Sequence, residues 1–88
     1  MTDSVNARIR GILSDHAKLA TDMTSVGDGD DLYAAGMTSH ASVTVMLACE
    51  DEWDIEFPQH MLKKSTFATI DSIAEALAEL DITDESVA

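Results

Sequence analysis

Three segments of this chain carry apolar residues at spacings of three and four, and no segment alternates between apolar and polar residues. Such spacing puts apolar side chains on one face of an α-helix, whereas a half-buried strand needs a period of two. The stripes are Val5, Ile9, Ile12, Leu13 and Ala17; Ser42, Val45, Met46, Cys49 and Trp53; and Ile70, Ile73, Ala74, Leu77 and Leu80. The sequence therefore predicts an all-α fold, a small antiparallel bundle of three main helices plus one short helix.

Polar, glycine and proline residues mark the limits of these helices. The predicted elements of a single domain, 1–88, are a helix at 4–20, a long loop at 21–38, a helix at 39–53, a loop with a short helix at 54–65, a helix at 69–80 and a frayed tail at 81–88. Asp3 or Ser4 is expected to cap the first helix, and Thr66 or Thr69 the last. A loop as long as 21–38 in a small domain is more often functional than not.

Acidic residues dominate the charge: 17 Asp and Glu stand against 5 Lys and Arg, for a net charge of −12. No Lys or Arg occurs between Lys18 and Lys63, and that interval holds nine acids: Asp22, Asp28, Asp30, Asp31, Glu50, Asp51, Glu52, Asp54 and Glu56. Such a surface repels nucleic acid and anionic lipid and attracts basic protein surfaces. Solubility alone is the alternative explanation.

The compartment is predicted from what the sequence lacks. No apolar run approaches the roughly 20 residues of a membrane span, and the first residues do not resemble a signal peptide. A single cysteine, Cys49, cannot form an internal disulfide and is expected in the core. We therefore expect a cytoplasmic protein without a membrane partner, and a monomer as the simplest state of so charged a bundle.

Neither a catalytic group nor a metal site is predicted. His16, His40 and His60 lie in different elements and do not form a pair spaced for metal binding. The sequence "DGDD" at 28–31 lacks the ligand ladder and closing Glu of a calcium loop, so a solvated acidic loop is favoured. A chain of this length is not expected to be an enzyme by itself.

Ser39 stands where the long loop becomes a helix. Local chemistry favours a helix N-cap, for which Ser is well suited. The alternative is an exposed hydroxyl that another enzyme modifies. Val43 and Leu47 follow at intervals of four on the same side of the helix, with Glu50 and Asp51 beside them, and this face is predicted to dock partners.

The stretch "DLYAAGMTSH…CEDEWDIEFP" resembles the acyl carrier protein family. The family has an Asp-Leu pair, a short linker, Gly-x-Asp-Ser-Leu, an amphipathic helix, an acidic end with an aromatic residue, and Pro. Here Gly36 and Ser39 match the Gly and the Ser, Pro58 follows without a gap, and the likeness covers nearly the whole chain. The acidic end is Glu50, Asp51, Glu52 and Trp53.

This resemblance implies a non-catalytic carrier. A phosphopantetheinyl transferase would attach 4′-phosphopantetheine from coenzyme A to Ser39, a loading enzyme with a basic docking surface would charge the thiol, and a downstream enzyme would accept the acyl group. Thr38 replaces the family's Asp and His40 its Leu, and Thr44 replaces a frequent acid, which points to a specialised carrier. The residues expected to contact partners are Met37, Thr38, His40, Val43, Thr44, Leu47, Glu50 and Asp51.

The cargo is predicted by resemblance alone. The whole chain is similar to stand-alone bacterial carriers that receive amino acids from truncated, seryl-tRNA-synthetase-like amino acid:[carrier protein] ligases. An amino acid on the pantetheine thiol is therefore the main hypothesis. A carrier of fatty acyl, polyketide or sugar-linked chains, and an unmodified adaptor that binds partners through its acidic second helix, remain the alternatives.

Overall fold

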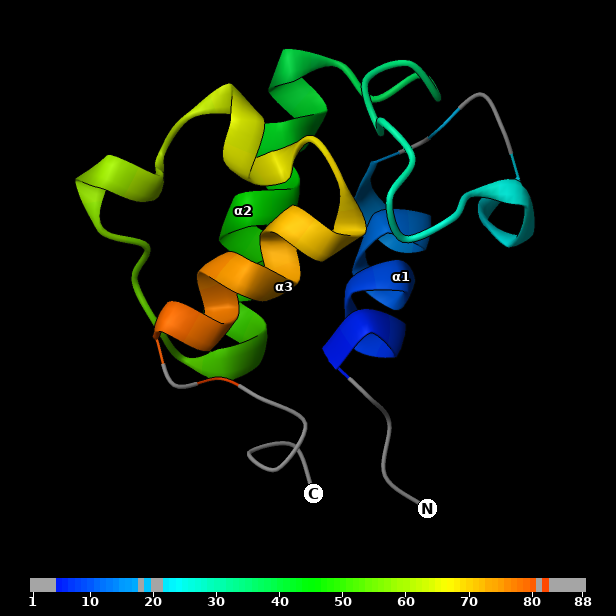
Figure 1. The fold of residues 1–88 in the computed structure, drawn as a ribbon. Helices are drawn as coiled ribbons and strands as arrows, with labels where there is room; N and C mark the ends of the chain where they lie inside the picture. Colours follow the sequence, from blue (N-terminus) through cyan, green and yellow to red (C-terminus); the bar gives the residue numbers. More distant parts are fainter. Residues whose placement is uncertain (1–4, 18, 20–21, 81, 83–88) are drawn as a thin grey trace.

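The computed structural model describes residues 5–17, 19, 22–80 and 82. Its elements are three α-helices and three 3₁₀ turns: α1 (Val5–His16), η1 (Met23–Ser25), α2 (Ser39–Trp53), η2 (Gln59–Met61), η3 (Lys64–Phe67) and α3 (Ile70–Glu79). In Figure 1, α1 and α2 run in opposite directions, and η3 lies against α2. The part of the chain that the structure describes has no strand, so the all-α prediction is confirmed.

The apolar stripes of the three helices meet in one core, because α1 contacts both α2 and α3. The largest fully buried side chains are Ile9, Leu13, Leu32, Val45, Cys49, Ile70, Ile73 and Leu77. Burying one such aliphatic side chain contributes about 1.5–3 kcal/mol. The loop after α2 adds Phe57, whose ring packs edge-on against Phe67 with centroids 5.6 Å apart and planes at 85°.

α1 ends earlier than the prediction of a helix over 4–20, because the loop that follows folds back along it. The last residue of the helix is His16, and the Ala17 amide still donates to the Leu13 carbonyl at 2.9 Å. One Arg10 nitrogen donates to the Met23 carbonyl at 3.2 Å, and the other pairs with Asp28 at 2.6 Å. The proposed caps Asp3 and Ser4, residues 18 and 20 of the predicted helix, and all of the predicted tail except residue 82 lie outside the described residues.

Three aspartates that are not buried form hydrogen bonds that shape the long loop. Asp30 accepts a hydrogen bond from the Gly27 amide at 2.8 Å, and Asp31 accepts one from the Tyr33 amide at 2.9 Å. Asp28 accepts from Arg10 and from Asn6, and these hydrogen bonds hold the pKa of its carboxyl below its usual range. The described residues contain no group of three or more side chains that could hold a metal ion.

α3 is capped by Thr69, one of the two predicted caps. The Thr69 hydroxyl accepts from the Ser72 amide at 2.9 Å, and the Ser72 hydroxyl accepts from the Thr69 amide at 3.0 Å. This reciprocal capping box satisfies two amides that the helix itself cannot pair. None of the helices described here has the length and apolar character that crossing a membrane requires.

Candidate functional site

Thr38, and not Ser39, caps α2. Thr38 has extended backbone angles, φ −82° and ψ 164°, and its hydroxyl accepts from the Ala41 amide at 3.0 Å. Ser39 is the first helical residue, so the interpretation of Ser39 as the cap is wrong. The residue that departs from the family's Asp therefore supplies the capping oxygen, which Asp would also provide.

The Ser39 hydroxyl is exposed at the beginning of α2. Among the described residues, none forms a hydrogen bond with its Oγ, while its carbonyl accepts from the Ser42 hydroxyl at 2.6 Å. Because Thr38 supplies the cap, the Ser39 side chain is not needed to cap α2. A modifying enzyme can therefore reach this oxygen without breaking the helix terminus.

The turn before α2 fixes where Ser39 is presented. Leu32 is fully buried, its amide donates to the Ala68 carbonyl at 2.7 Å, and its own carbonyl accepts from the Met37 amide at 3.0 Å. Gly36 has a φ of 116°, a conformation that side chains with a Cβ rarely adopt. Met37 is only 3% exposed and anchors the turn in the core, while its expected contact with partners stays a prediction.

The outer face of α2 is apolar at the two predicted positions. Val43 is 50% exposed and Leu47 is 54% exposed. Leu62, 48% exposed, is a third large apolar side chain on the surface, and the sequence analysis missed it. The only sequence signal of an exposed position was that Leu62 is followed by two lysines. This signal does not predict that Leu62 lies near α2.

The polar residues predicted to contact partners differ in how accessible they are. His40 and Asp51 are exposed. The Thr44 hydroxyl donates back to the His40 carbonyl at 3.4 Å, within α2. One carboxylate oxygen of Glu50 accepts from the Phe57 amide at 2.9 Å, so Glu50 also holds the loop after α2 in place.

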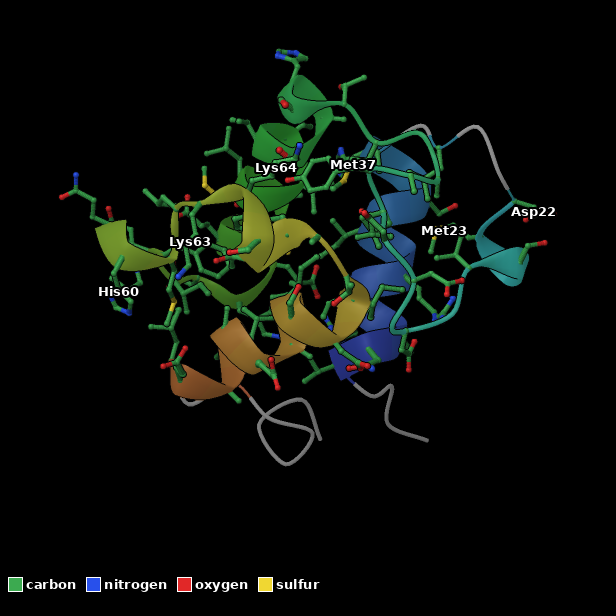
Figure 2. All side chains as sticks on the ribbon, turned by 45° about the horizontal axis from the view of Figure 1, so that its top comes forward. Asp22, Met23, Met37, His60, Lys63 and Lys64 are labelled. Carbon is green, nitrogen blue, oxygen red and sulfur yellow. The ribbon has the colours of Figure 1, made fainter. Side chains whose placement is uncertain are left out.

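A surface groove of about 260 Å³ begins at Ser39 and lies between α2 and η3. Val43, Met46, Leu62 and Phe67 contribute apolar side chains to it, and Tyr33, Lys63 and Lys64 also line it. The Lys64 ammonium lies 4.8 Å from the centre of the Tyr33 ring, whose hydroxyl donates to the Lys64 carbonyl at 3.2 Å. In Figure 2, Lys64 lies beside α2, and Lys63 lies on the side of η2 with His60.

Cys49 does not provide a reactive thiol. Its side chain is fully buried on the core face of α2, as the sequence predicts. Burial, and to a lesser extent the charge of Glu50, raises the pKa of the thiol to about 12. A thioester on this protein would therefore need a thiol that the chain itself does not present.

Comparison with known proteins identifies the family. The model of the family described as "Phosphopantetheine attachment site" matches residues 7–77. An aminoacyl carrier protein of Agrobacterium fabrum is 44% identical over 73 residues, which cover 83% of this chain and 88% of the relative.

Two solved structures show the same fold. One is the carrier protein from Agrobacterium tumefaciens, bound to an engineered Bradyrhizobium japonicum glycine:[carrier protein] ligase and AMP. It is 44% identical to this chain with a TM-score of 0.80, and the match covers 83% of this chain and 97% of the matched chain. The other is the holo acyl carrier protein NE2163 of Nitrosomonas europaea, with 23% identity, a TM-score of 0.74, and coverage of 89% and 96%. This chain belongs to the phosphopantetheine-attachment family of carrier proteins, which are not themselves catalysts and bear a covalent 4′-phosphopantetheine, and it is a homologue of an aminoacyl carrier protein.

Proposed function

We propose that this protein holds an amino acid as a thioester on a 4′-phosphopantetheine arm attached to Ser39, and delivers it to a downstream acceptor enzyme. The observation that supports the site best is the exposed Ser39 hydroxyl, which the Thr38 cap leaves without an internal partner. The resemblance of the stretch around Ser39 to the family motif supports the same residue.

The groove beside Ser39 fits the proposed arm. The 4′-phosphopantetheine arm is a flexible chain that contains two amides. Two methyl groups lie near its anionic phosphate, and a pair of methylene groups follows each amide. The groove offers apolar side chains from α2 and η3 and two lysine side chains. The arm supplies the thiol that the buried Cys49 cannot. The Ser39 oxygen loses its proton and bonds to the phosphorus next to pantetheine in coenzyme A, while the pyrophosphate bond breaks and adenosine 3′,5′-bisphosphate leaves.

The proposed partners follow from the relatives. A carrier 44% identical to this chain forms a complex with an engineered glycine:[carrier protein] ligase and AMP. An ATP-dependent amino acid:[carrier protein] ligase that takes a small amino acid is therefore the proposed loading enzyme. A phosphopantetheinyl transferase is the proposed modifying enzyme. The exposed face of Val43 and Leu47, with the acidic Asp51 beyond it, is the proposed docking surface for basic partner surfaces. Cytoplasmic location and a monomeric state stay predictions.

Two steps of mass spectrometry test the proposal. Incubation with a broad-specificity transferase and coenzyme A should add about 340 Da to the intact protein, and the Ser39→Ala variant should gain nothing. Ser42→Ala is a matched control, because Ser42 is the next serine on α2 but is mostly buried. The holo protein should then gain one aminoacyl group with ATP and an amino acid ligase.

The outcomes separate the alternatives. Loading with fatty acyl groups but with no amino acid would favour the fatty acyl or polyketide carrier. No mass gain with several transferases would favour the unmodified adaptor. A thioester-bound cargo on Ser39→Ala would show that the attachment site is elsewhere.

A further inference from the structure

Two lysines of this acidic protein, Lys63 and Lys64, differ from the arginines in their ion pairing. Of the four Lys and Arg side chains that the structure describes, Arg8 pairs with Glu52 and Arg10 pairs with Asp28. Lys63 and Lys64 form no ion pair with any described residue. In a chain of net charge −12, two adjacent cations without carboxylate partners leave a local site where an anion can approach.

Both lysines lie at the groove that begins at Ser39. They line it together with Val43 and Leu62, although Lys63 and Lys64 are separated from Ser39 by more than 20 residues of sequence. Lys64 is held in this position through its contact with the Tyr33 ring and through the hydrogen bond from the Tyr33 hydroxyl to its carbonyl. The cations therefore come from η3 and the residue before it, and they line the same groove as Ser39.

We propose that Lys63 and Lys64 bind the phosphodiester of the pantetheine arm and hold the arm along the groove. This inference rests on the proposed attachment at Ser39. A phosphodiester at Ser39 carries one negative charge, and an ammonium group is a strong donor to phosphate oxygens. The apolar side chains of the groove would contact the pantetheine methyl and methylene groups and reinforce the ion pair.

A held arm has a consequence for delivery. Val43 and Leu62 are both part of the groove and half exposed, so a partner that docks on this face covers the place where the arm rests. In the absence of a partner, the arm stays beside its own protein.

NMR of the apo and holo proteins tests the inference. The holo protein is first verified by its gain of about 340 Da, and the amide shifts of the apo and holo forms are then compared. Beyond the neighbours of Ser39, shifts are expected at Leu62 and Phe67. The chemical-shift differences at these two residues should fall by more than about half in the Lys63→Gln/Lys64→Gln variant. They should fall similarly in the unmutated protein when salt is raised from about 0.05 to 1 M, because salt screens exposed charges.

Control variants isolate the role of the lysines. Lys63→Arg/Lys64→Arg keeps both charges and should retain the shifts. Arg8→Gln removes one positive charge outside the groove and should leave them unchanged, which excludes an effect of net charge alone. Far-UV circular dichroism verifies that each variant keeps its helices, and the salt series on the unmutated protein tests the contact without any substitution.

The possible results are distinct. A verified holo protein whose shifts are confined to residues 38–41 would overturn the inference and leave the carrier proposal intact. Shifts at Leu62 and Phe67 that persist without the lysines and at high salt would show an arm held by apolar contacts alone, which also overturns it. Absence of the mass gain would overturn the attachment at Ser39 and this inference with it.

Discussion

At the scale of single residues, Thr38 and Ser39 divide two tasks that the sequence alone assigns to one of them. Thr38 satisfies the Ala41 amide, and Ser39 keeps its hydroxyl exposed. This division explains how the chain can have Thr in place of the family's Asp before the Ser and still cap α2, which begins at Ser39. The side chain before Ser39 needs an acceptor oxygen for the helix, and Thr supplies one.

The role of Thr38 as the cap of α2 can be tested by measuring the free energy of unfolding. Thr38→Ala should lower the free energy of unfolding by about 1 kcal/mol, because it removes the hydroxyl that accepts from the Ala41 amide. Thr38→Ser keeps this hydroxyl and should stay close to the unmutated protein. Urea unfolding of the apo protein measures the difference. A loss in Ser39→Ala equal to that in Thr38→Ala would contradict the assignment of the cap.

The burial of Cys49 makes a second prediction. With its pKa raised to about 12, the thiol should not react with a thiol reagent at pH 8 in the folded apo protein, and should react at once in urea. The folded protein keeps the Cys49 thiol protonated at pH values above 9.0, where a free thiol would ionise. The stabilisation that the buried thiol contributes is therefore fully present below pH 9 and is lost as the pH rises toward 12. Rapid labelling of the native apo protein would contradict this burial.

At the scale of the element, α2 has two apolar faces with different tasks. Val45 and Cys49 are fully buried and hold the helix in the bundle, while Val43 and Leu47 are about half exposed. The helix is therefore apolar around more of its circumference than packing requires. Exposed apolar side chains of this kind are typical of surfaces that bind a partner.

Substitutions on the outer face should weaken partner binding without unfolding the bundle. Val43→Asp or Leu47→Asp is expected to lower the affinity for an amino acid ligase about tenfold or more, which corresponds to about 1.4 kcal/mol. Helix content should stay native, because neither side chain belongs to the core. Calorimetric titration and circular dichroism measure the two effects. Val45→Asp is the control, since a charge at this buried position should disrupt the fold. Native affinity in both outer variants would exclude this face as the docking surface.

At the scale of the whole molecule, the net charge of −12 predicts the kinetics of association. Steering of a basic partner toward an acidic protein raises the association rate at low salt. We expect added salt to slow association strongly and to change dissociation little, as measured by stopped-flow fluorescence with a ligase. Association rates that do not depend on salt would mean that the acids serve solubility alone.

The sequence by itself determined the helical class and the core faces, because both depend on spacings within one helix. The attachment residue was predicted in another way, from the resemblance of residues 31–39 to a family motif. The stripes of α2 and α3 appear in the structure where the period of 3.6 residues puts them, and Thr69 caps α3 as one of two predicted caps. The exposure of Val43 and Leu47 also follows from helical geometry, since the core face of α2 is turned away from them.

Only the tertiary structure decided which residue caps α2, that Met37 is buried, and what surrounds Ser39. The cap depends on where the turn from Leu32 to Met37 ends, and that turn is tied to Ala68, far along the chain. The groove joins Ser39 to Leu62 and Lys64, which come from segments after α2. Local patterns cannot predict these contacts, because they arise from the packing of segments that are distant in sequence and meet only when the core closes.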